Sequence, residues 1–326
     1  MAALSRLATA IDDGALTLPE GDIAVFRPGA GVDLAPLPRE AVHIVQGFAP
    51  DAAAWQGRGY AVEREPPAGA NSALVCVPRS KDFAKALIAQ AAALVPGGLI
   101  VVDGQKTDGV DSLMKAVRAR LPVEGLSKAH GRLFWFRATE SFADWAAESP
   151  APTPAGHLTL PGVFSEGGVD AGSALLAELL PEALPGRVVD LGAGWGFLAL
   201  AALSRAGVTT IDLVEAEARA LECARLNVTD ARARFHWADA TCWAPEGPVD
   251  HVICNPPFHT GRAGTPELGL AFIDAAARML GPKGSLWLVA NRQLPYEAHL
   301  RARFRSGEEL TGTARFKIFH ASRPAR

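Results

Sequence analysis

A short apolar run that leads into closely spaced glycines is the feature that most restricts the fold of this chain. Residues 188–196 read Val-Val-Asp-Leu-Gly-Ala-Gly-Trp-Gly, and apolar residues at helical spacing follow over 197–205. Glycine has no Cβ and tolerates positive φ, so the backbone can bend sharply there and let a ligand touch it. The pattern predicts a buried strand, a tight turn and a helix, which together form one unit of a parallel α/β sheet.

The length of the chain and its prolines predict two domains. A chain of 326 residues is long for one domain, because a typical domain has about 100–150 residues. Prolines are dense over 142–168, at Pro150, Pro152, Pro154 and Pro161, which indicates a linker or extended segment rather than a packed element. We therefore expect one domain over residues 1–150 and a second over 151–326.

The second half alternates short apolar runs with longer helical patterns. Expected strands cover 187–191, 210–214, 235–238, 251–254, 285–290 and 316–321, and expected helices cover 197–205, 217–227 and 268–280. Strands that alternate with helices in this way predict βαβ units and a parallel sheet.

The first half repeats part of this order. Residues 72–78 parallel 250–256, and each run is followed by a helical pattern, a Pro/Gly turn and another strand. This alignment places Cys76 opposite Cys254 and Val77 opposite Asn255. It predicts a duplicated domain, in which the first copy has lost a polar side chain and is catalytically inactive.

The glycine spacing favours a nucleoside ligand over a dinucleotide. A dinucleotide-binding loop has the pattern GxGxxG/A, whereas this loop reads GxGxG, with Phe197 in the sixth position. Glu215 ends the next expected strand, and a carboxylate at that point can accept hydrogen bonds from both ribose hydroxyls. The alternative is an ordinary tight turn without a ligand. The candidate cofactor contacts of this region are Asp190, Gly192, Ala193, Gly194, Gly196 and Glu215.

Asp239, followed by Ala240, ends the third expected strand. Its carboxylate can accept a hydrogen bond from an adenine amino group, or it can cap a helix or turn. Both interpretations stay open, and both residues are candidate cofactor contacts.

The most informative stretch reads Asn255-Pro256-Pro257-Phe258 and follows an expected strand. In open α/β sheets, ligands bind at the carboxyl ends of the strands. Two prolines fix the backbone and remove two N–H donors, so the Asn255 side-chain oxygen and the Pro256 carbonyl can accept both N–H bonds of an exocyclic amino group. Phe258 can stack on a flat base. These four residues are the candidate catalytic residues, and a rigid turn with an Asn cap is the alternative.

The chain resembles class I S-adenosylmethionine-dependent methyltransferases, and most closely the ribosomal RNA small subunit methyltransferase C family, which modifies guanine N2 of 16S rRNA. The stretches that carry the resemblance are 160–165 (Leu-Pro-Gly-Val-Phe-Ser), 170–173, 255–259, 289–291, 294–296 and 316–318. The resemblance implies two tandem Rossmann-like domains, the first degenerate and serving RNA docking or structure. It also implies that Phe164 and Asp170 help to enclose the cofactor. Glu215 stands where the family usually has Asp, a change that keeps the carboxylate.

Three other functions are compatible with parts of the pattern. Methylation of adenine N6 or of a protein glutamine amide also uses an Asn-Pro-Pro motif with an aromatic residue. An inactive RNA assembly factor that only binds the cofactor is the alternative from a different class. The intact loop glycines, Glu215 and Asn255 argue against that alternative. Phe258-His259 in place of Tyr, together with the layout of two domains, favours guanine over adenine or glutamine.

Composition and charge bear on the location and the partners. No apolar run reaches the roughly 18–20 residues that span a bilayer, and the four cysteines have no CxxC spacing. We expect a cytoplasmic protein without a metal site, whose partner is ribosomal RNA or the small ribosomal subunit. The net charge of −3 does not itself indicate a nucleic-acid binder, although residues 292–326 are rich in arginine.

Overall fold

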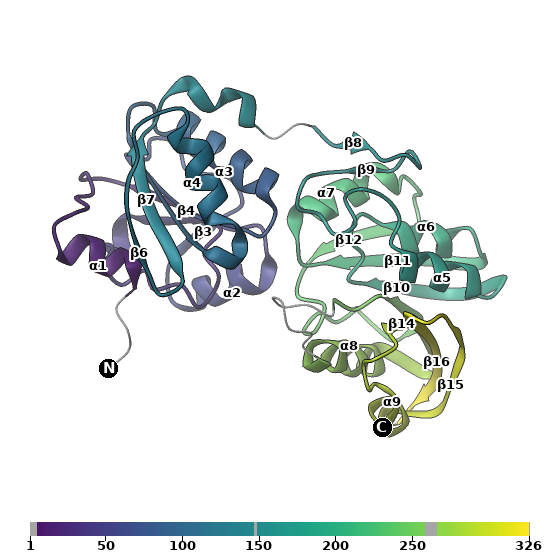
Figure 1. Cartoon of the computed structure of the whole chain (residues 1–326). Helices are drawn as coiled ribbons and strands as arrows, with labels where there is room; N and C mark the ends of the chain where they lie inside the picture. The colour runs from purple at the N-terminus through teal and green to yellow at the C-terminus, as the bar shows by residue number, and fades with distance from the viewer. Residues whose placement is uncertain (1–4, 147–148, 258–265, 326) are drawn as a thin grey trace. The chain divides into compact units, whose positions relative to one another are not determined.

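The computed structural model describes residues 5–146, 149–257 and 266–325. The chain divides into two compact units, residues 1–149 and 150–326. Each unit is a mixed sheet with helices on both of its faces (Figure 1). This architecture confirms the predicted α/β fold class with two Rossmann-like domains.

The first unit contains a seven-stranded sheet with the order β3-β2-β1-β4-β5-β7-β6. Strands β1 to β5 run parallel, and β7 is antiparallel to both β5 and β6. The strands are β1 (Ile23–Phe26), β2 (Val42–Val45), β3 (Ala61–Glu63), β4 (Ser72–Cys76), β5 (Leu99–Gln105), β6 (Glu124–Lys128) and β7 (Gly131–Arg137). The helices are α1 (Arg6–Asp12), α2 (Ala49–Gly57), α3 (Lys81–Leu94) and α4 (Val110–Arg118), with short 3₁₀ turns at Arg39–Ala41, Lys106–Asp108 and Glu140–Trp145.

The second unit repeats this topology, because its seven-stranded sheet has the order β12-β11-β10-β13-β14-β16-β15. The strands are β8 (Ala151–Pro152), β9 (Leu158–Thr159), β10 (Ala183–Leu191), β11 (Ala206–Glu215), β12 (Ala233–Trp237), β13 (Val249–Cys254), β14 (Leu280–Asn291), β15 (Phe304–Gly312) and β16 (Phe316–Pro324). The helices are α5 (Ala171–Leu179), α6 (Phe197–Leu203), α7 (Ala218–Asn227), α8 (Pro266–Met279) and α9 (Glu297–Arg303). The identical strand order of the two units agrees with the predicted duplication.

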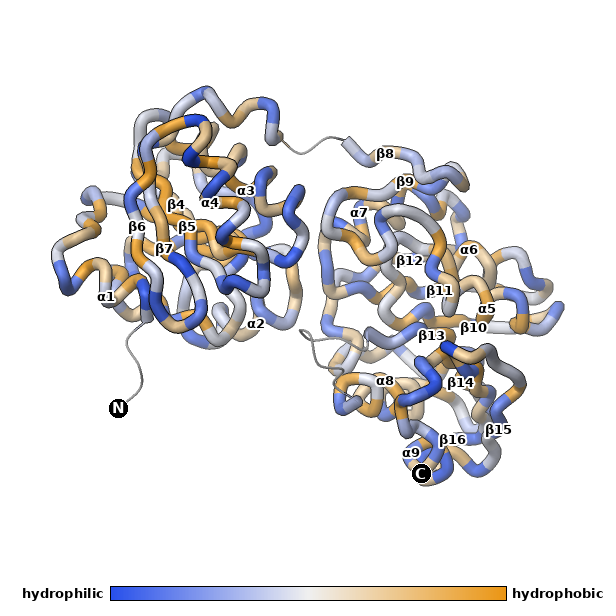
Figure 2. The backbone as a smooth tube through the Cα atoms, in the orientation of Figure 1, coloured by the Kyte–Doolittle hydropathy of each residue, from blue (hydrophilic) through white to orange (hydrophobic). Residues whose placement is uncertain are grey.

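Burial explains why the central strands form where the sequence predicts them. Residues 188–191 at the end of β10 are completely buried, as expected for a parallel strand with helices on both faces. Figure 2 shows the same concentration of apolar residues along central strands such as β4 and β5. The edge strand β15 is exposed over nearly its whole length, and its mixed sequence gives no alternating pattern. The sequence therefore did not predict it.

The proline-rich segment is not simply a linker, so that part of the prediction is wrong. Within the second unit, β8 and β9 form a small hairpin. Leu160 and Val163 then pack in a buried cluster with Trp195, Ala220 and Cys223. The apolar residues between the prolines therefore fix this segment next to the glycine loop.

The hydrogen-bond ladders show which residues of the two units are equivalent. After β1, the Arg27 N–H donates to the Val45 carbonyl, and after β10 the Gly192 N–H donates to the Val214 carbonyl. Arg27 and Gly192 also share a left-handed conformation, with φ of +57° and +80°. Arg27 is therefore the counterpart of Gly192, and the residue after Val45 is the counterpart of the residue after Val214.

The same registers correct the predicted alignment of Cys76 with Cys254. Cys76 packs on the sheet face covered by α1 and α2, whereas Cys254 packs on the face covered by α8 and α9. A slip of one residue moves every side chain of a strand to the opposite face, so these two cysteines are not equivalent. Val75 is the counterpart of Cys254, and the counterpart of Asn255 is Cys76 rather than Val77.

None of the described helices is long and apolar enough to cross a membrane. Among the described residues, no three or more His, Cys, Asp or Glu side chains are grouped so that they could hold a metal ion.

Candidate active site

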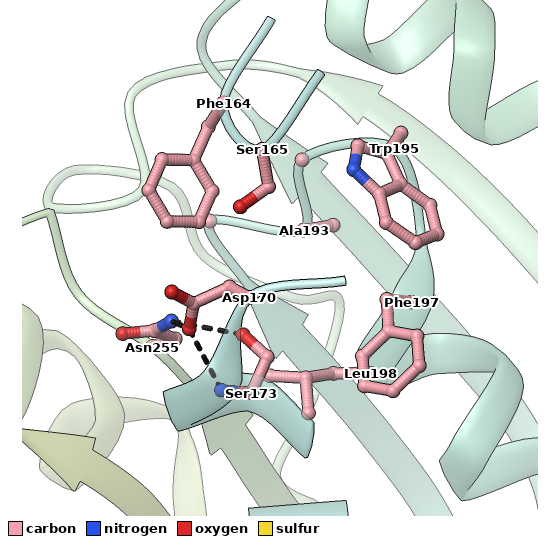
Figure 3. Close-up of a pocket in the computed structure, with 11 residues that line it drawn as sticks. Phe164, Ser165, Asp170, Ser173, Ala193, Trp195, Phe197, Leu198 and Asn255 are labelled. Carbon is pink, nitrogen blue, oxygen red and sulfur yellow. Dashed lines mark hydrogen bonds between the residues drawn. The ribbon is translucent and has the colours of Figure 1, made fainter. Parts of the chain in front are cut away.

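The carboxyl ends of β10 and β13 and the segments around them form a pocket in the second unit (Figure 3). The loop after β10, the start of α5 and the residue that follows β13 all contribute to it. The residues that line the pocket are Phe164, Ser165, Asp170, Ser173, Gly192, Ala193, Gly194, Trp195, Phe197, Leu198 and Asn255.

The glycine loop needs its glycines for different reasons. All three have positive φ, namely +80° at Gly192, +56° at Gly194 and +94° at Gly196. A Cβ at Gly196 would lie 2.7 Å from a methyl group of Val228, so α6 could not begin there with a larger residue. A Cβ at Gly194, in contrast, would meet no atom within 4 Å. Gly194 therefore leaves open space beside the backbone, as a ligand-binding loop requires.

Glu215 fixes this loop from the end of β11. Its Oε2 atom accepts a hydrogen bond of 2.7 Å from the Gly194 N–H, and its Oε1 atom accepts one of 2.8 Å from the Glu217 N–H. Burial raises the pKa of the Glu215 carboxyl, while these backbone donors oppose that rise. Each carboxylate oxygen has a further lone pair, so Glu215 can still accept hydrogen bonds from a pair of ligand hydroxyls.

Asp190 is a completely buried carboxyl two residues before Gly192, and neither of its oxygens has a hydrogen-bond partner among the described residues. Burial and, to a smaller degree, the neighbouring charge of Glu215 raise its pKa to about 8. Leaving a buried acceptor unsatisfied costs about 1–3 kcal/mol. The raised pKa favours the protonated carboxyl, which lessens that cost, and Asp190 is not among the residues that line the pocket.

Asp239 and Ala240 have a local role in the structure. The Oδ1 atom of Asp239 accepts hydrogen bonds from the Thr241 N–H at 2.8 Å and the Thr241 hydroxyl at 2.7 Å. Ala240 is buried in the core of the unit. Neither residue lines the pocket. The turn-capping role is therefore present, and contact of Asp239 with an adenine stays a prediction.

Asn255 follows β13 with its amide group held in one orientation. Its Nδ2 atom donates to Asp170 Oδ2 at 3.0 Å and to Ser173 Oγ at 2.8 Å. The Oδ1 atom points away from both partners (Figure 3). Pro256 is buried and Pro257 is exposed, whereas the predicted stacking residue Phe258 lies outside the described residues.

Phe164 is an exposed aromatic residue at the pocket. Its exposed fraction is 58%, high for a large apolar side chain, and its ring faces the Asn255 side of the pocket (Figure 3). Ser165 follows with a φ of +57°, a conformation that few residues other than glycine adopt. The segment that carries them is anchored by Asn227, whose Nδ2 atom donates to the carbonyls of Leu158 and Trp195.

Comparison with known proteins identifies the family. The model of the methyltransferase small domain matches residues 156–320. The ribosomal RNA small subunit methyltransferase C of Shewanella oneidensis is 32% identical over 77% of this chain and 76% of its own length. This chain belongs to the ribosomal RNA small subunit methyltransferase C family. The enzyme of that name from Shewanella sp. strain MR-4 is 33% identical over 72% of each chain.

A solved structure supports the same assignment for the fold of the whole chain. The T. thermophilus 16S rRNA N2 G1207 methyltransferase, in complex with AdoMet and guanosine, has a TM-score of 0.80 and 26% identity. The similarity covers 95% of this chain and 90% of that chain. Membership of the methyltransferase C family confirms the resemblance stated from sequence and the prediction of methyltransferase activity.

Two residues of this methyltransferase site were not predicted from its sequence. Ser173 was noted only as part of the resemblance, and Asn227 was not singled out. Their partners lie 82 and 69 residues away along the chain, so no local pattern reveals the contacts. Three cations of the basic tail, residues 292–326, form ion pairs. Arg292 contacts Glu309, Arg303 contacts Asp274 and Lys317 contacts Glu297.

Proposed function

We propose that the second unit transfers a methyl group from S-adenosylmethionine to the exocyclic N2 of a guanine in 16S ribosomal RNA. The observation that carries this proposal is the orientation of the Asn255 amide at the pocket: both of its N–H groups are engaged, and its side-chain oxygen has no hydrogen-bond partner among the described residues. The names of the relatives and the AdoMet and guanosine of the T. thermophilus complex support the same reaction.

The loop after β10 and the end of β11 are the proposed binding site of S-adenosylmethionine. Glu215 would accept hydrogen bonds from the ribose hydroxyls, and Gly194 would let the nucleoside approach the backbone. Asp190, the buried carboxyl two residues before Gly192, is a further proposed contact of the cofactor. When bound, S-adenosylmethionine supplies an electrophilic methyl group on a positively charged sulfur. Gly192, Ala193, Gly196, Asp239, Ala240 and Phe164 are further proposed cofactor contacts.

The proposed role of the Asn-Pro-Pro-Phe motif is to orient the amino group of guanine. The Asn255 Oδ1 atom and the Pro256 carbonyl accept the two N–H bonds, which directs the nitrogen lone pair towards the methyl donor. Pro257 keeps the turn rigid, and Phe258 stacks on the base. Orientation of this kind can lower a barrier substantially without a covalent intermediate. The proton that the amine loses passes to water.

We propose that the two domains have different roles. Residues 151–326 form the catalytic domain, and residues 1–150 form a degenerate domain that docks RNA or supports folding. The first unit has Cys76 in place of Asn255 and Gln46 in place of Glu215, so it lacks the amide proposed to orient the base and the carboxylate proposed to bind the ribose. The proposed partner is the small ribosomal subunit or its RNA, in the cytoplasm, where the target guanine would be flipped out of its helix or loop to reach the pocket.

Nucleoside mapping of ribosomal RNA tests the proposed function. Small-subunit RNA from a strain that lacks this protein would be compared by mass spectrometry with RNA from the parent strain. We expect the loss of one N2-methylguanosine, restored by the wild-type protein and not by the Asn255→Ala variant. An unchanged profile of small-subunit RNA would refute the proposed substrate.

A further inference from the structure

One oxygen of Asp170 connects the start of α5 to the end of β13. Asp170 is the N-cap of α5, and its Oδ2 atom accepts a hydrogen bond of 2.8 Å from the Ser173 N–H. The same oxygen accepts the bond of 3.0 Å from Asn255 Nδ2. The Ser173 hydroxyl accepts the second N–H of this amide at 2.8 Å. Both hydrogens of the Asn255 amide nitrogen are thus bound by adjacent groups at one helix terminus.

These contacts fix the orientation of the Asn255 amide. A carboxylate accepts hydrogen bonds but has no hydrogen to donate. If the Asn255 amide were rotated by half a turn, its oxygen would face the Asp170 carboxylate, and two acceptors would oppose each other. The nitrogen therefore stays against Asp170 and Ser173, and the oxygen is directed away from them (Figure 3), where none of the described residues donates a hydrogen bond to it.

The packing around this contact allows little movement. Ser173 is buried, with 7% of its surface exposed. A Cβ at Gly172 would lie 3.1 Å from Asp170 Oδ2 and 3.1 Å from the ring of Phe316. A larger residue at this position would thus push on the oxygen that holds Asn255. Asp170, Gly172 and Ser173 therefore all contribute to the placement of the Asn255 amide.

The first unit offers an internal control for this interpretation. Its equivalent helix, α1, is capped by Ser5, whose hydroxyl accepts a hydrogen bond from the Ala8 N–H. Ser5 and Ala8 stand where the second unit has Asp170 and Ser173, and Cys76 stands where it has Asn255. A serine is therefore sufficient to cap this helix, and the longer carboxylate with its partner hydroxyl occurs in the unit that has an amide to hold.

We propose that Asp170 and Ser173 are positioning residues, which we call the amide clamp, and that they fix the Asn255 oxygen towards the amino group of the target base. The proposal rests on the proposed function of Asn255 in methyl transfer. It gives the Asp-x-Gly-Ser stretch a role different from the enclosure of the cofactor that the family resemblance implies.

Four variants of the full chain distinguish the effect of the amide clamp on catalysis from the effect of the helix cap on stability. Asp170→Ser keeps an N-cap of the Ser5 type but is too short to reach Asn255, whereas Asp170→Asn keeps an oxygen of the right length. Ser173→Ala removes the second acceptor. Ser5→Ala removes a helix cap in the unit without the site and is the matched control. Each variant would be assayed for kcat on unmethylated 16S rRNA, for the Kd of S-adenosylhomocysteine by calorimetry, and for its melting temperature.

The clamp predicts a specific pattern of losses. Asp170→Ser and Ser173→Ala should each lower kcat by roughly 10- to 100-fold, because small misplacements of an orienting group have effects of this size. Their Kd for S-adenosylhomocysteine should change by less than about twofold. Asp170→Asn should lose less than about tenfold in kcat, since a neutral hydrogen bond is about half as strong as a charged one. Ser5→Ala should lower only the melting temperature.

Other results would overturn the clamp. If Asp170→Ser weakens S-adenosylhomocysteine binding as much as it lowers kcat, Asp170 is a cofactor contact. If Asp170→Ser and Ser173→Ala both retain the wild-type kcat while Asn255→Ala is inactive, the clamp is wrong and the proposed function stands. Full activity of Asn255→Ala would instead refute the role proposed for Asn255 itself.

Discussion

The two units of this chain share one topology but differ at the edge where a ligand would bind. The orders of the two seven-stranded sheets are identical when the strands are counted from β1 in the first unit and from β10 in the second. Four positions of the proposed site in the second unit have different chemistry in the first. The pairs, with the second unit first, are Asp190 and Val25, Gly192 and Arg27, Glu215 and Gln46, and Asn255 and Cys76.

Gln46, the counterpart of Glu215 in the first unit, forms hydrogen bonds within its own unit. Its Oε1 atom accepts a hydrogen bond of 2.9 Å from the Phe48 N–H, as Glu215 accepts one from Glu217. Its Nε2 atom donates to the Pro28 carbonyl at 3.0 Å, and the Trp55 indole donates to the same carbonyl at 2.9 Å. Both polar atoms of the Gln46 amide therefore have partners within the first unit, whereas the carboxyl of Asp190 in the second unit has none among the described residues. The fold tolerates either arrangement, and function depends on the groups left unsatisfied.

Asn255→Cys gives the second unit the residue of the first at this position. The thiol is a weak acceptor, so the amino group of the base would lose its orientation. We expect a loss of about 100- to 1000-fold in kcat, as for removal of other preorganised groups, with S-adenosylhomocysteine binding unchanged. Single-turnover methylation of 16S rRNA measures the first effect and calorimetry the second. Wild-type turnover of this variant would show that the exchange of Asn255 for Cys76 does not account for the different activities proposed for the two units.

Glu215→Gln makes the corresponding exchange at the end of β11. The amide oxygen can still accept one backbone N–H, but the charge that strengthens hydrogen bonds to hydroxyls is lost. We expect cofactor binding to weaken by about 1.5–3 kcal/mol, the usual size of a hydrogen bond to a charged group. Calorimetric titration with S-adenosylhomocysteine would measure the change in Kd. Wild-type affinity would mean that the ribose binds elsewhere.

The buried carboxyl of Asp190 should make the stability of the chain depend on pH. Its pKa is raised to about 8 in the folded chain, and in the unfolded chain it is close to about 3.9. The folded state therefore binds the proton more tightly, and stability falls as the pH rises between these values. Relative to the Asp190→Asn variant, the wild type should lose at least about 1.4 kcal/mol of unfolding free energy between pH 5 and pH 8, which corresponds to one unit of pKa.

Urea unfolding of both proteins at these two pH values measures the difference, without bound cofactor. A parallel dependence of the two proteins on pH would show that Asp190 is not protonated in the folded chain. The first unit has Val25 at this position and should contribute no such dependence.

The reverse exchange, Gln46→Glu, should not give the first unit a cofactor site. A carboxylate at this position would face the Pro28 carbonyl, which has no hydrogen to donate, so we expect a loss of about 1–3 kcal/mol in stability. Urea unfolding checks that loss, and the methylation assay should show wild-type kcat. A second binding site for S-adenosylhomocysteine in this variant would show that the side chain at position 46 alone prevents the first unit from binding the cofactor.

The sequence predicted the parts of this structure that depend on local patterns. The glycine loop, Glu215 at the end of the next strand and the position of Asn255 after β13 follow from short motifs within buried strands. The amide clamp could not be predicted, because Asp170 and Asn255 are 85 residues apart and meet only through tertiary structure. Alignment of the two halves by residue type also erred by one position. Apolar runs do not record the register, which the hydrogen-bond ladders determine.

Binding stoichiometry is the most direct test of the claim that two similar units contain a single site. Titration of the full chain with S-adenosylhomocysteine should give one site per chain. The Gly192→Arg variant, which introduces the counterpart residue Arg27 of the first unit, should bind none while keeping a cooperative melting transition. Two sites per chain, or one site that survives in a folded Gly192→Arg variant, would contradict the account.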